Sequence, residues 1–406
     1  MGADLSQVLA AHPAPPPAID VGRMRRERHQ RLQAELARRD VDAAVLLRSS
    51  DVAYATGQAV RGVDAAHAAF ERPVAVVVAG EERPHLLWDD VDPGLADDVE
   101  AHPAVWPELD EGAESLAGVL AEIVGAGRRM AVDEQSGAML RRGVFGGGPL
   151  VDAAELVGAA KLVKTADELA CIGEAQRLNE AAMPAAQAVL RPGSTRREVA
   201  GVFLAELGRL GVDANLIDPI FQRMPRSIAD GPRTTTGHVA FPTGADETFA
   251  EGDLVWVDAG IDHLGYASDF GRTWVVGRDP DPAEQRLFER WCEVMLAVLD
   301  VLGPGVSGGD LCRAAEAAHE GERPWLPHFY LAHGVGVESA EMPLVGTDLG
   351  TAFDDGLVMA PGMVLVLEPV AWEDGVGGYR AEEIVTVTAD GWHHLGSGHP
   401  YPPFAP

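Results

Sequence analysis

Four acidic residues beside strand-like apolar runs are the first sign of chemistry in this sequence. They are Asp258, Asp269, Glu368 and Glu382. A carboxylate embedded in apolar strands is costly to ionise without a partner, because burial removes its hydration. Four such groups brought together would also repel one another, whereas two divalent cations would cancel their four negative charges. The set therefore predicts a metal site wherever the fold brings these strands together.

A fifth candidate ligand supplies nitrogen. His333 opens the segment His333-Gly-Val-Gly-Val-Glu338, whose glycines let a strand approach its neighbours closely. Four carboxylates and one imidazole form a hard, oxygen-rich set, which suits Mn²⁺, Fe²⁺, Co²⁺ or Zn²⁺ better than copper or an iron–sulfur cluster. Two ions sharing these ligands would lower the pKa of a bridging water and polarise a substrate oxygen. Hydrolysis is the chemistry that this set favours.

The acidic residues belong to an internal repeat in the second half of the chain. Three pairs of landmarks recur in the same order: Leu190–Val199 with Leu302–Leu311, Gly252–Asp258 with Gly362–Glu368, and Asp269 with Glu382. The offsets are 112, 110 and 113 residues. One Pro-Gly turn can recur by chance, but three matches at nearly one offset indicate duplication. The sequence predicts a repeated helix–helix–strand–strand unit about a pseudo-two-fold axis, with both copies contributing carboxylates.

Capping patterns predict the helices of this second half. Thr165-x-x-Glu168 and Thr195-x-x-Glu198 are capping boxes, each followed by apolar residues at helical spacing. A further helix is expected after Pro282, with Leu287 and Trp291 among its buried residues. We interpret these apolar stripes as core and assign them no function.

The pattern of the first half predicts a separate α/β domain. Helices are expected over Arg23–Arg39 and Leu116–Ile123. The strand-like runs are Ala43–Leu47, Pro73–Val78, His85–Trp88 and Met130–Asp133. This alternation predicts an α/β domain of residues 1–160. Gly143–Gly148 lacks the spacing of a phosphate-binding loop and is expected to be an ordinary loop.

Composition excludes several classes of partner. The 406 residues carry a formal net charge of −31, which disfavours binding to nucleic acid or to an anionic membrane surface. The three cysteines form no Cys-x-x-Cys pair, so neither a disulfide framework nor a thiolate zinc site is expected. No run reaches the ~18 apolar residues of a membrane span, and residues 1–17 do not read as a signal peptide. A cytoplasmic protein is the expectation.

These motifs resemble those of the pita-bread metallopeptidases: methionine aminopeptidase, aminopeptidase P, prolidase and the related creatinase. The matching segments in the second half are Val257-Asp258-Ala-Gly, Tyr266-Ala-Ser-Asp269-Phe-Gly-Arg-Thr273, His333-Gly-Val-Gly, Leu367-Glu368-Pro and Tyr379-Arg-Ala-Glu382-Glu. In the first half, Asp51-Val-Ala-Tyr-Ala-Thr-Gly57 is similar to the N-terminal domain of the prolidase, aminopeptidase P and creatinase branch. The resemblance implies an α/β N-terminal domain and an α+β pita-bread domain of residues 161–406.

The resemblance also implies a role for each candidate ligand. Asp258 would bind one ion, His333 and Glu368 the other, and Asp269 and Glu382 would bridge the two. Glu368 would additionally take a proton from the attacking water. The expected cofactors are two divalent ions (Mn, Co, Fe or Zn). Creatinase lacks this ligand set, so its presence here counts against a metal-free mechanism.

The histidines near the site depart from the family pattern. Peptidases of the family carry a second histidine seven residues after the ligand, where this chain has Ala340. Loss of a donor near the scissile bond usually costs 10²–10³ in rate. His328 and His238 are candidates for a substrate or catalytic role, each weighed against a purely structural one. Two further residues, His393 and His394, are expected to be exposed in a turn.

Arginines provide the remaining candidates. Arg380 is expected to orient Glu382 from outside the ligand set. Arg223, Arg226 and Arg233 are either recognition groups for a substrate carboxylate or plain surface charges.

The function predicted from the sequence is metal-dependent hydrolysis of a small peptide of the Xaa-Pro type, by a homodimer as is usual in this branch. Two alternatives stay open. The first is an enzyme of the same fold acting on another bond, such as a dimethylsulfoniopropionate lyase or a C–N hydrolase, which the change at Ala340 would suit. The second is a non-catalytic binding protein, against which the intact ligand set argues.

Overall fold

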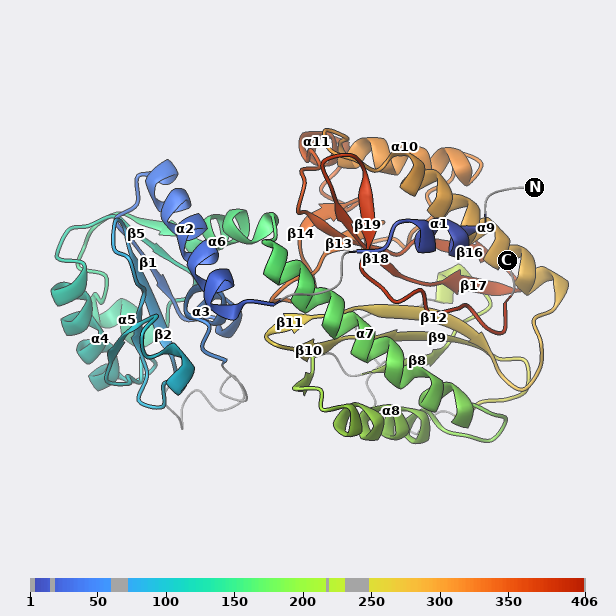
Figure 1. Cartoon of the computed structure of the whole chain (residues 1–406), viewed down its shortest axis with the longest axis horizontal. Coiled ribbons are helices and arrows are strands. Elements are labelled where there is room, and N and C mark those ends of the chain that lie inside the picture. Colours follow the sequence, from blue (N-terminus) through green and yellow to red (C-terminus); the bar gives the residue numbers. More distant parts are fainter. Residues whose placement is uncertain (1–3, 15–18, 60–71, 217–218, 231–247, 405–406) are drawn as a thin grey trace. The chain divides into compact units, whose positions relative to one another are not determined.

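The computed structural model describes the chain apart from residues 1–3, 15–18, 60–71, 217–218, 231–247 and 405–406. Contacts divide it into two compact units, one of residues 20–167 and one of residues 1–19 together with 168–406 (Figure 1). The sequence predicts a boundary at residue 160 and places the first residues in the N-terminal domain. In the structure residues 1–19 are grouped with the C-terminal unit, and the described residues 4–14 pack against its elements.

The unit of residues 20–167 is built on a mixed sheet of six strands in the order β4-β3-β2-β1-β5-β6. The strands are β1 (Ala43–Leu46), β2 (Val74–Val78), β3 (His85–Leu87), β4 (Glu100–His102), β5 (Met130–Val132) and β6 (Leu150–Asp152). Strand β1 pairs in parallel with β5 and antiparallel with β2. Its residues are all buried, which explains why its sequence is apolar throughout rather than alternating.

Helices and short turns connect these strands. They are α2 (Val21–Arg39), α3 (Ser49–Thr56), α4 (Asp110–Ile123), α5 (Gly137–Arg142), α6 (Ala153–Leu162) and the 3-10 turn η1 (Pro93–Leu95). Helix α2 begins where the Asp20 carboxylate accepts the backbone N–H of Arg23. Helix α4 buries Leu116 and Leu120 against the core that the sheet also lines. The strands and helices predicted for this half are present, with ends shifted by a few residues.

The C-terminal unit contains the predicted repeat. Its helices are α1 (Leu5–Ala11), α7 (Ala166–Val189), α8 (Arg196–Leu210), α9 (Pro282–Val301), α10 (Gly308–Ala318), α11 (Thr351–Gly356) and the turn η2 (Ile228–Asp230). Thr195 and Ser307 stand at equivalent places of the two copies, and each closes a capping box at the start of its helix. Each also forms an isolated bridge, Thr195 to Thr248 and Ser307 to Val358.

Strands of the two copies form separate sheets. One has the order β12-β9-β8, and the other β14-β13-β15-β18-β19. Smaller sheets pair β11-β10-β7 and β16-β17. The strands are β7 (Ala214–Asn215), β8 (Ile220–Arg223), β9 (Leu254–Ala259), β10 (Ile261–His263), β11 (Tyr266–Ala267), β12 (Phe270–Val275), β13 (Ala332–Gly334), β14 (Glu341–Val345), β15 (Val364–Leu367), β16 (Val370–Glu373), β17 (Gly377–Arg380), β18 (Glu383–Val387) and β19 (Trp392–His394). The repeat thus places β9 and β12 in correspondence with β15 and β18.

The N-terminal helix explains where the first residues belong. Helix α1 buries Leu5 and Leu9 and packs against α9 and β19. The following segment continues along the edge of β19, where the His394 N–H donates to the His12 carbonyl at 2.7 Å. The His12 ring stacks on Trp392 with centroids 4.4 Å apart. These contacts attach residues 4–14 to the C-terminal unit and cover an edge strand that would otherwise be open.

Within the described ranges, no helix combines the length and the apolar sequence that crossing a membrane requires.

Candidate metal centre

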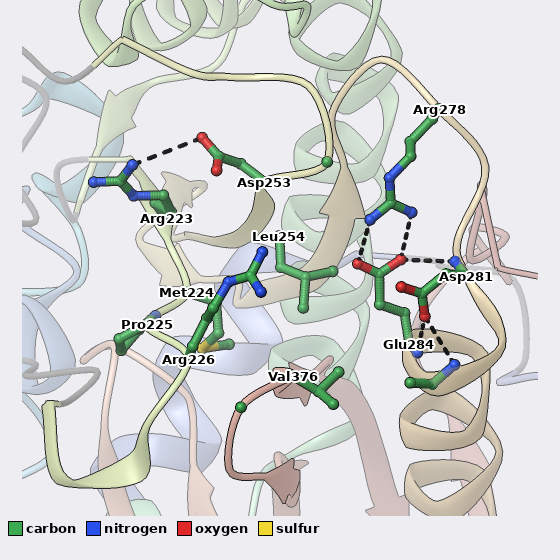
Figure 2. A pocket seen from close by; sticks show the side chains of 13 residues that line it. Arg223, Met224, Pro225, Arg226, Asp253, Leu254, Arg278, Asp281, Glu284 and Val376 are labelled. Carbon is green, nitrogen blue, oxygen red and sulfur yellow. Dashed lines mark hydrogen bonds and ion pairs between the residues drawn. The ribbon is translucent and has the colours of Figure 1, made fainter.

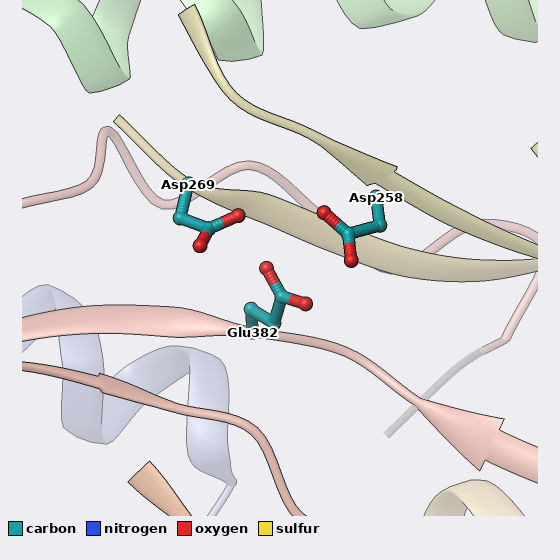
Figure 3. A group of neighbouring side chains, drawn as sticks. All are labelled: Asp258, Asp269 and Glu382. Atoms are coloured by element: carbon teal, nitrogen blue, oxygen red, sulfur yellow. The ribbon is translucent and has the colours of Figure 1, made fainter. Parts of the chain in front are cut away.

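Two strands of the first repeat copy carry the aspartates. Asp258 lies on β9 opposite Gly271 of β12, and Asp269 immediately precedes β12. Glu382 immediately precedes β18 in the second copy, and its N–H donates to the Gly271 carbonyl at 3.0 Å. That hydrogen bond joins the two copies at the site. One carboxylate oxygen from each of the three acidic residues lies within 4.8 Å of the others (Figure 3).

Gly271 makes this approach possible. A β-carbon built there would lie 2.5 Å from Glu382 Cδ and 2.6 Å from its Oε1. No side chain can be accommodated without displacing the Glu382 carboxylate. The site therefore needs glycine at this position of the Asp269-Phe-Gly-Arg-Thr273 motif, because a larger residue would collide with the Glu382 carboxylate.

The second copy adds an imidazole and a fourth carboxylate. His333 lies on β13, and Glu368 directly follows β15, which pairs with β13. His333 Nδ1 donates to the Gly334 carbonyl at 2.9 Å, which assigns the ring proton to that nitrogen. His333 Nε2 lies 3.3 Å from Asp269 Oδ2 and 3.4 Å from Glu368 Oε1, so in the neutral ring its lone pair would be directed at both. A lone pair directed at two carboxylate oxygens calls for a cation between them.

Arg380 is placed among the carboxylates. Its Nη1 contacts Asp258 Oδ2 at 3.1 Å, and its Nη2 contacts Glu382 Oε1 at 2.6 Å and also pairs with Glu368 Oε2. The guanidinium lies over the Trp256 ring, 4.5 Å from its centroid. The sequence suggests that Arg380 orients Glu382, and in the structure it contacts three of the four acidic residues.

One arginine cannot neutralise this cluster. Four carboxylates and one guanidinium leave three negative charges in a site where Glu368 and Glu382 are almost completely buried. Burial raises the pKa of Glu368 to about 8, and the charge of Glu382 adds to the effect. Burial and the neighbouring carboxylates likewise raise the pKa of Asp269 and of Glu382 well above the ordinary range. Without a further cation, protons would have to supply the missing positive charge.

The donor set fits divalent cations. Asp269 Oδ1, Glu368 Oε1 and Glu382 Oε2 are buried and have no hydrogen-bond partner within the described part of the chain. Buried carboxylate oxygens without partners are costly, and coordination to a metal ion would satisfy them. Oxygen ligands with one imidazole nitrogen suit Mn²⁺, Fe²⁺, Co²⁺ or Zn²⁺.

A second buried network surrounds Glu383, the residue after Glu382 and the first of β18. Glu383 Oε1 pairs with Arg272 at 2.9 Å and accepts the Tyr401 hydroxyl at 2.6 Å, while its Oε2 contacts His394 Nε2 at 2.8 Å. Although burial opposes ionisation, these three partners lower the pKa of Glu383 to about 2. Arg272 also donates to the Glu382 carbonyl at 2.8 Å, so this network supports the backbone of the neighbouring ligand.

The expectation for His394 is therefore wrong. It lies on β19, is buried, and bonds to Glu383 rather than being exposed in a turn. A pairing between β18 and β19 creates this contact, and nothing in the local Gly-Trp-His-His sequence indicates it.

The other two candidate histidines are not placed in the cluster. His328 has a side chain that is 91% exposed, and its Nδ1 contacts Asp348 Oδ2 at 2.6 Å. His238 lies outside the described residues. Ala340 is exposed in the segment between β13 and β14.

Aromatic side chains that the sequence analysis did not single out lie beside the cluster. Phe329 stacks on Tyr330 with centroids 4.2 Å apart, and Tyr330 meets the His333 ring edge-on at 5.0 Å. Phe329 also lies under the Arg380 guanidinium. Burial, together with the charge of Glu368, raises the pKa of Tyr330 above its ordinary value. In the sequence, the feature that could have identified Phe329 and Tyr330 is their position just before the His333 motif.

Arg223 and Arg226 line a different cavity, of about 340 Å³, beside the start of β9 (Figure 2). Arg223 faces Asp253 at 4.0 Å. Arg278 in the same cavity pairs with Glu284 at 2.7 Å. Leu254 lines the cavity and Asp258 lies four residues further along the strand, a separation of about 13 Å. Neither arginine is therefore placed at the carboxylate cluster.

Models of two known protein families match the chain. Residues 170–389, more than half of the chain, match the model of metallopeptidase family M24. Residues 28–163 match that of the creatinase/prolidase N-terminal domain. Together the two matches account for both compact units and confirm the predicted fold class.

Individual relatives are distant in sequence and similar in fold. The Xaa-Pro dipeptidase of Pyrococcus horikoshii is 28% identical over 243 residues, which are 59% of this chain and 64% of that protein. The uncharacterised peptidase YqhT of Bacillus subtilis is 27% identical over 60% of this chain and 64% of its own length. The matched region thus spans less than two thirds of these curated relatives. Among solved structures, the Pyrococcus horikoshii prolidase superposes with a TM-score of 0.69 at 21% identity, covering 92% of this chain and 98% of that one. An Xaa-Pro dipeptidase from Bacillus anthracis gives 0.71 at 20% identity, with the same coverage.

Proposed function

The chain belongs to metallopeptidase family M24, and from that premise we propose that it hydrolyses the Xaa-Pro bond of small peptides in a metal-dependent reaction. The observation that carries this proposal is the convergence of four carboxylates and His333 Nε2, with buried carboxylate oxygens that have no hydrogen-bond partner among the described residues. Relatives named as Xaa-Pro dipeptidases support the choice of substrate.

Family membership implies divalent metal ions, and we propose two of them. Asp258 would hold one ion, and His333 and Glu368 the other, with Asp269 and Glu382 shared between them. Three negative charges that Arg380 leaves uncompensated favour more than a single divalent ion. When bound, the ions would lower the pKa of a water molecule and polarise the scissile carbonyl.

The chain's own groups would prepare and complete that step. Arg380 holds Asp258, Glu368 and Glu382 in one orientation through its two terminal nitrogens. Glu368, whose Oε1 has no hydrogen-bond partner among the described residues, would take the proton of the attacking water and return it to the leaving amine. Arg272 and Thr273 fix the two strands that carry the ligands, since Thr273 Oγ1 donates to the Arg380 carbonyl at 2.7 Å.

We also propose that the protein works in the cytoplasm as a homodimer. No disulfide involves Cys171, Cys292 or Cys312, all of which lie in the described part of the chain, and this suits a reducing compartment. The dimer rests on the resemblance to the prolidase branch, and sedimentation equilibrium would test it.

Metal-dependent dipeptide hydrolysis tests the proposed function directly. Metal-free protein would be loaded separately with Mn²⁺, Co²⁺, Fe²⁺ and Zn²⁺ and assayed with Xaa-Pro dipeptides and with matched Xaa-Ala dipeptides. We expect turnover with at least one metal and a preference for proline. Folded, metal-bound protein that cleaves neither series contradicts the peptidase function and directs the search to the non-peptide substrates that the change at Ala340 would suit.

A further inference from the structure

Among the described residues, the site offers no free hydrogen-bond donor at the position where the resemblance to the family predicts one. The family's second histidine corresponds to Ala340, which is exposed and has no polar side chain. The nearby donors are already in use: His333 Nδ1 donates to a carbonyl, and Arg380 contacts three carboxylates. A peptidase needs a donor for the oxygen that becomes negative as water adds to the scissile carbonyl.

Tyr330 lies beside a candidate metal ligand. Its ring packs edge-on against His333, with centroids 5.0 Å apart, and it also stacks on Phe329. Burial, together with the charges of Glu368, Asp269 and Asp258, raises the pKa of its phenol, so the hydroxyl stays protonated. The side chain is only half-buried, so a ligand bound at the cluster can reach it.

The Tyr330 hydroxyl has no hydrogen-bond partner within the described part of the chain. The remaining tyrosines are committed elsewhere: Tyr54 donates to the Ala160 carbonyl, Tyr266 to Glu168 and Tyr401 to Glu383. The fifth, Tyr379, packs within an aromatic core of Phe288, Trp291 and Phe404. Of the five tyrosines, Tyr330 alone combines a ring that packs against a candidate metal ligand with a hydroxyl that has no partner among the described residues.

We propose that Tyr330 is a catalytic residue that donates its hydroxyl hydrogen bond to the scissile carbonyl oxygen, in place of the histidine absent at position 340. The inference rests on the proposed peptidase function and identifies the donor that this function needs. A phenol is neutral and protonated at neutral pH, so it can donate without adding charge to the site. No bond to Tyr330 forms or breaks, and the phenol keeps its proton throughout. Its hydrogen bond strengthens as the carbonyl oxygen gains negative charge, which lowers the barrier rather than tightening substrate binding.

The test compares Tyr330→Phe with Tyr379→Phe. Both variants lose one hydroxyl and keep the ring, but the Tyr379 hydroxyl is buried and has no hydrogen-bond partner among the described residues. Four quantities would be measured: metal content, kcat and KM for an Xaa-Pro dipeptide, affinity for a phosphinic dipeptide that mimics the tetrahedral intermediate, and affinity for the product proline.

For Tyr330→Phe we expect normal metal content, a fall in kcat of about 10²-fold and little change in KM. The phosphinic analogue should lose affinity by a similar factor, whereas proline should bind as before. Tyr379→Phe should match the wild type in all four measurements. A role limited to packing against His333 would leave both kcat and analogue binding unchanged in Tyr330→Phe.

Three results would overturn the donor role: Tyr330→Phe with wild-type kcat, an equal loss of proline and analogue affinity, or lost metal. Wild-type protein that fails to hydrolyse the dipeptide in the same assay instead contradicts the proposed function, and the inference with it. Hydrolysis by the wild type that Tyr330→Phe retains contradicts the inference alone.

Discussion

Glu382 and Glu383 are neighbours in sequence, both are buried, and they have opposite surroundings. Glu382 faces Asp258 and Asp269 and pairs with Arg380, and its pKa is raised well above the ordinary range, mainly by burial. Glu383 faces Arg272, His394 and Tyr401, which overcome the effect of burial and lower its pKa to about 2.

The surroundings of Glu382 suit the binding of a ligand, whereas those of Glu383 stabilise the fold. Every oxygen of Glu383 has a protein partner, so its charge stabilises the fold on its own. Glu382 has an ion pair from its Oε1 to Arg380, but its Oε2 has no hydrogen-bond partner among the described residues, so a ligand that supplies positive charge would stabilise the cluster. Side chains alternate across a strand, which is how adjacent residues reach such different surroundings.

The largest effect is expected from Glu382→Gln. The amide removes a shared ligand charge, so bound metal should be lost and hydrolysis should fall by at least about 10³-fold. Metal per chain after dialysis and Xaa-Pro turnover measure the two effects. A Glu382→Gln protein that keeps the wild-type metal content and rate contradicts the assignment of Glu382 as a ligand.

Glu383→Gln should act on stability instead. Removing this charge leaves Arg272 buried without its ion-pair partner, which we expect to lower the free energy of unfolding by about 3–5 kcal/mol. Urea denaturation of metal-free protein measures this change. In the same experiment Glu382→Gln should be at least as stable as the wild type, because it relieves repulsion among buried carboxylates. Equal destabilisation by both variants would remove the distinction drawn between the two residues.

Lowering the pH should remove the contribution of ionised Glu383 to the stability of the fold. Because the pKa of Glu383 in the folded protein is about 2, below its ordinary value of 4.5, its ionised form stabilises the fold above pH 4.5. That contribution, about 3 kcal/mol, is lost as the pH falls through 2. Denaturation curves at several pH values should show wild type and Glu383→Gln converging between pH 4.5 and 2. A stability difference that stays constant across this window contradicts the pKa assignment.

Gly271→Ala tests the close approach of the two repeat copies. Its methyl group would collide with the Glu382 carboxylate, so we expect metal affinity to fall by about 10–100-fold. Gly201→Ala is the matched control, since a β-carbon there meets no atom within 4 Å. Isothermal titration of each variant with Mn²⁺ measures the affinities. Equal affinities in the two variants would show that Glu382 can move aside without cost.

His328→Ala should have the smallest effect. Because its side chain is 91% exposed and contacts Asp348 rather than the cluster, kcat/KM should change by less than about twofold. Dipeptide hydrolysis under the conditions used for Tyr330→Phe measures it. A loss of about 10²-fold would instead give His328 the donor role assigned here to Tyr330.

Much of the candidate site could be predicted before any coordinates. Residue type and the offset of the repeat were enough to group Asp258, Asp269, Glu368 and Glu382, because duplicated elements place equivalent residues near one axis. Apolar runs and capping boxes likewise predicted the main helices and strands, since these patterns act over a few residues along the chain.

Other features depended on contacts between residues far apart in sequence. His394 looked exposed until the pairing of β19 with β18 placed it on Glu383. Arg380 was expected to serve one glutamate, but the approach of β9, β15 and β17 brings it to three acidic residues. The spacing of His328 from His333 predicts a role at the site. In the structure the backbone of His328 is left-handed (φ 60°), and its side chain is exposed to solvent.

The sequence by itself determined which chemical groups are present, in what order, and which elements carry them. Only the tertiary structure decided which of these groups share a buried space and which find partners. The physical reason is that a carboxylate's role depends on the charges and donors within a few ångströms, and strand pairing sets those neighbours. Glu382 and Glu383 are one peptide bond apart, yet Glu382 meets Asp258, Asp269 and Arg380, whereas Glu383 meets Arg272, His394 and Tyr401.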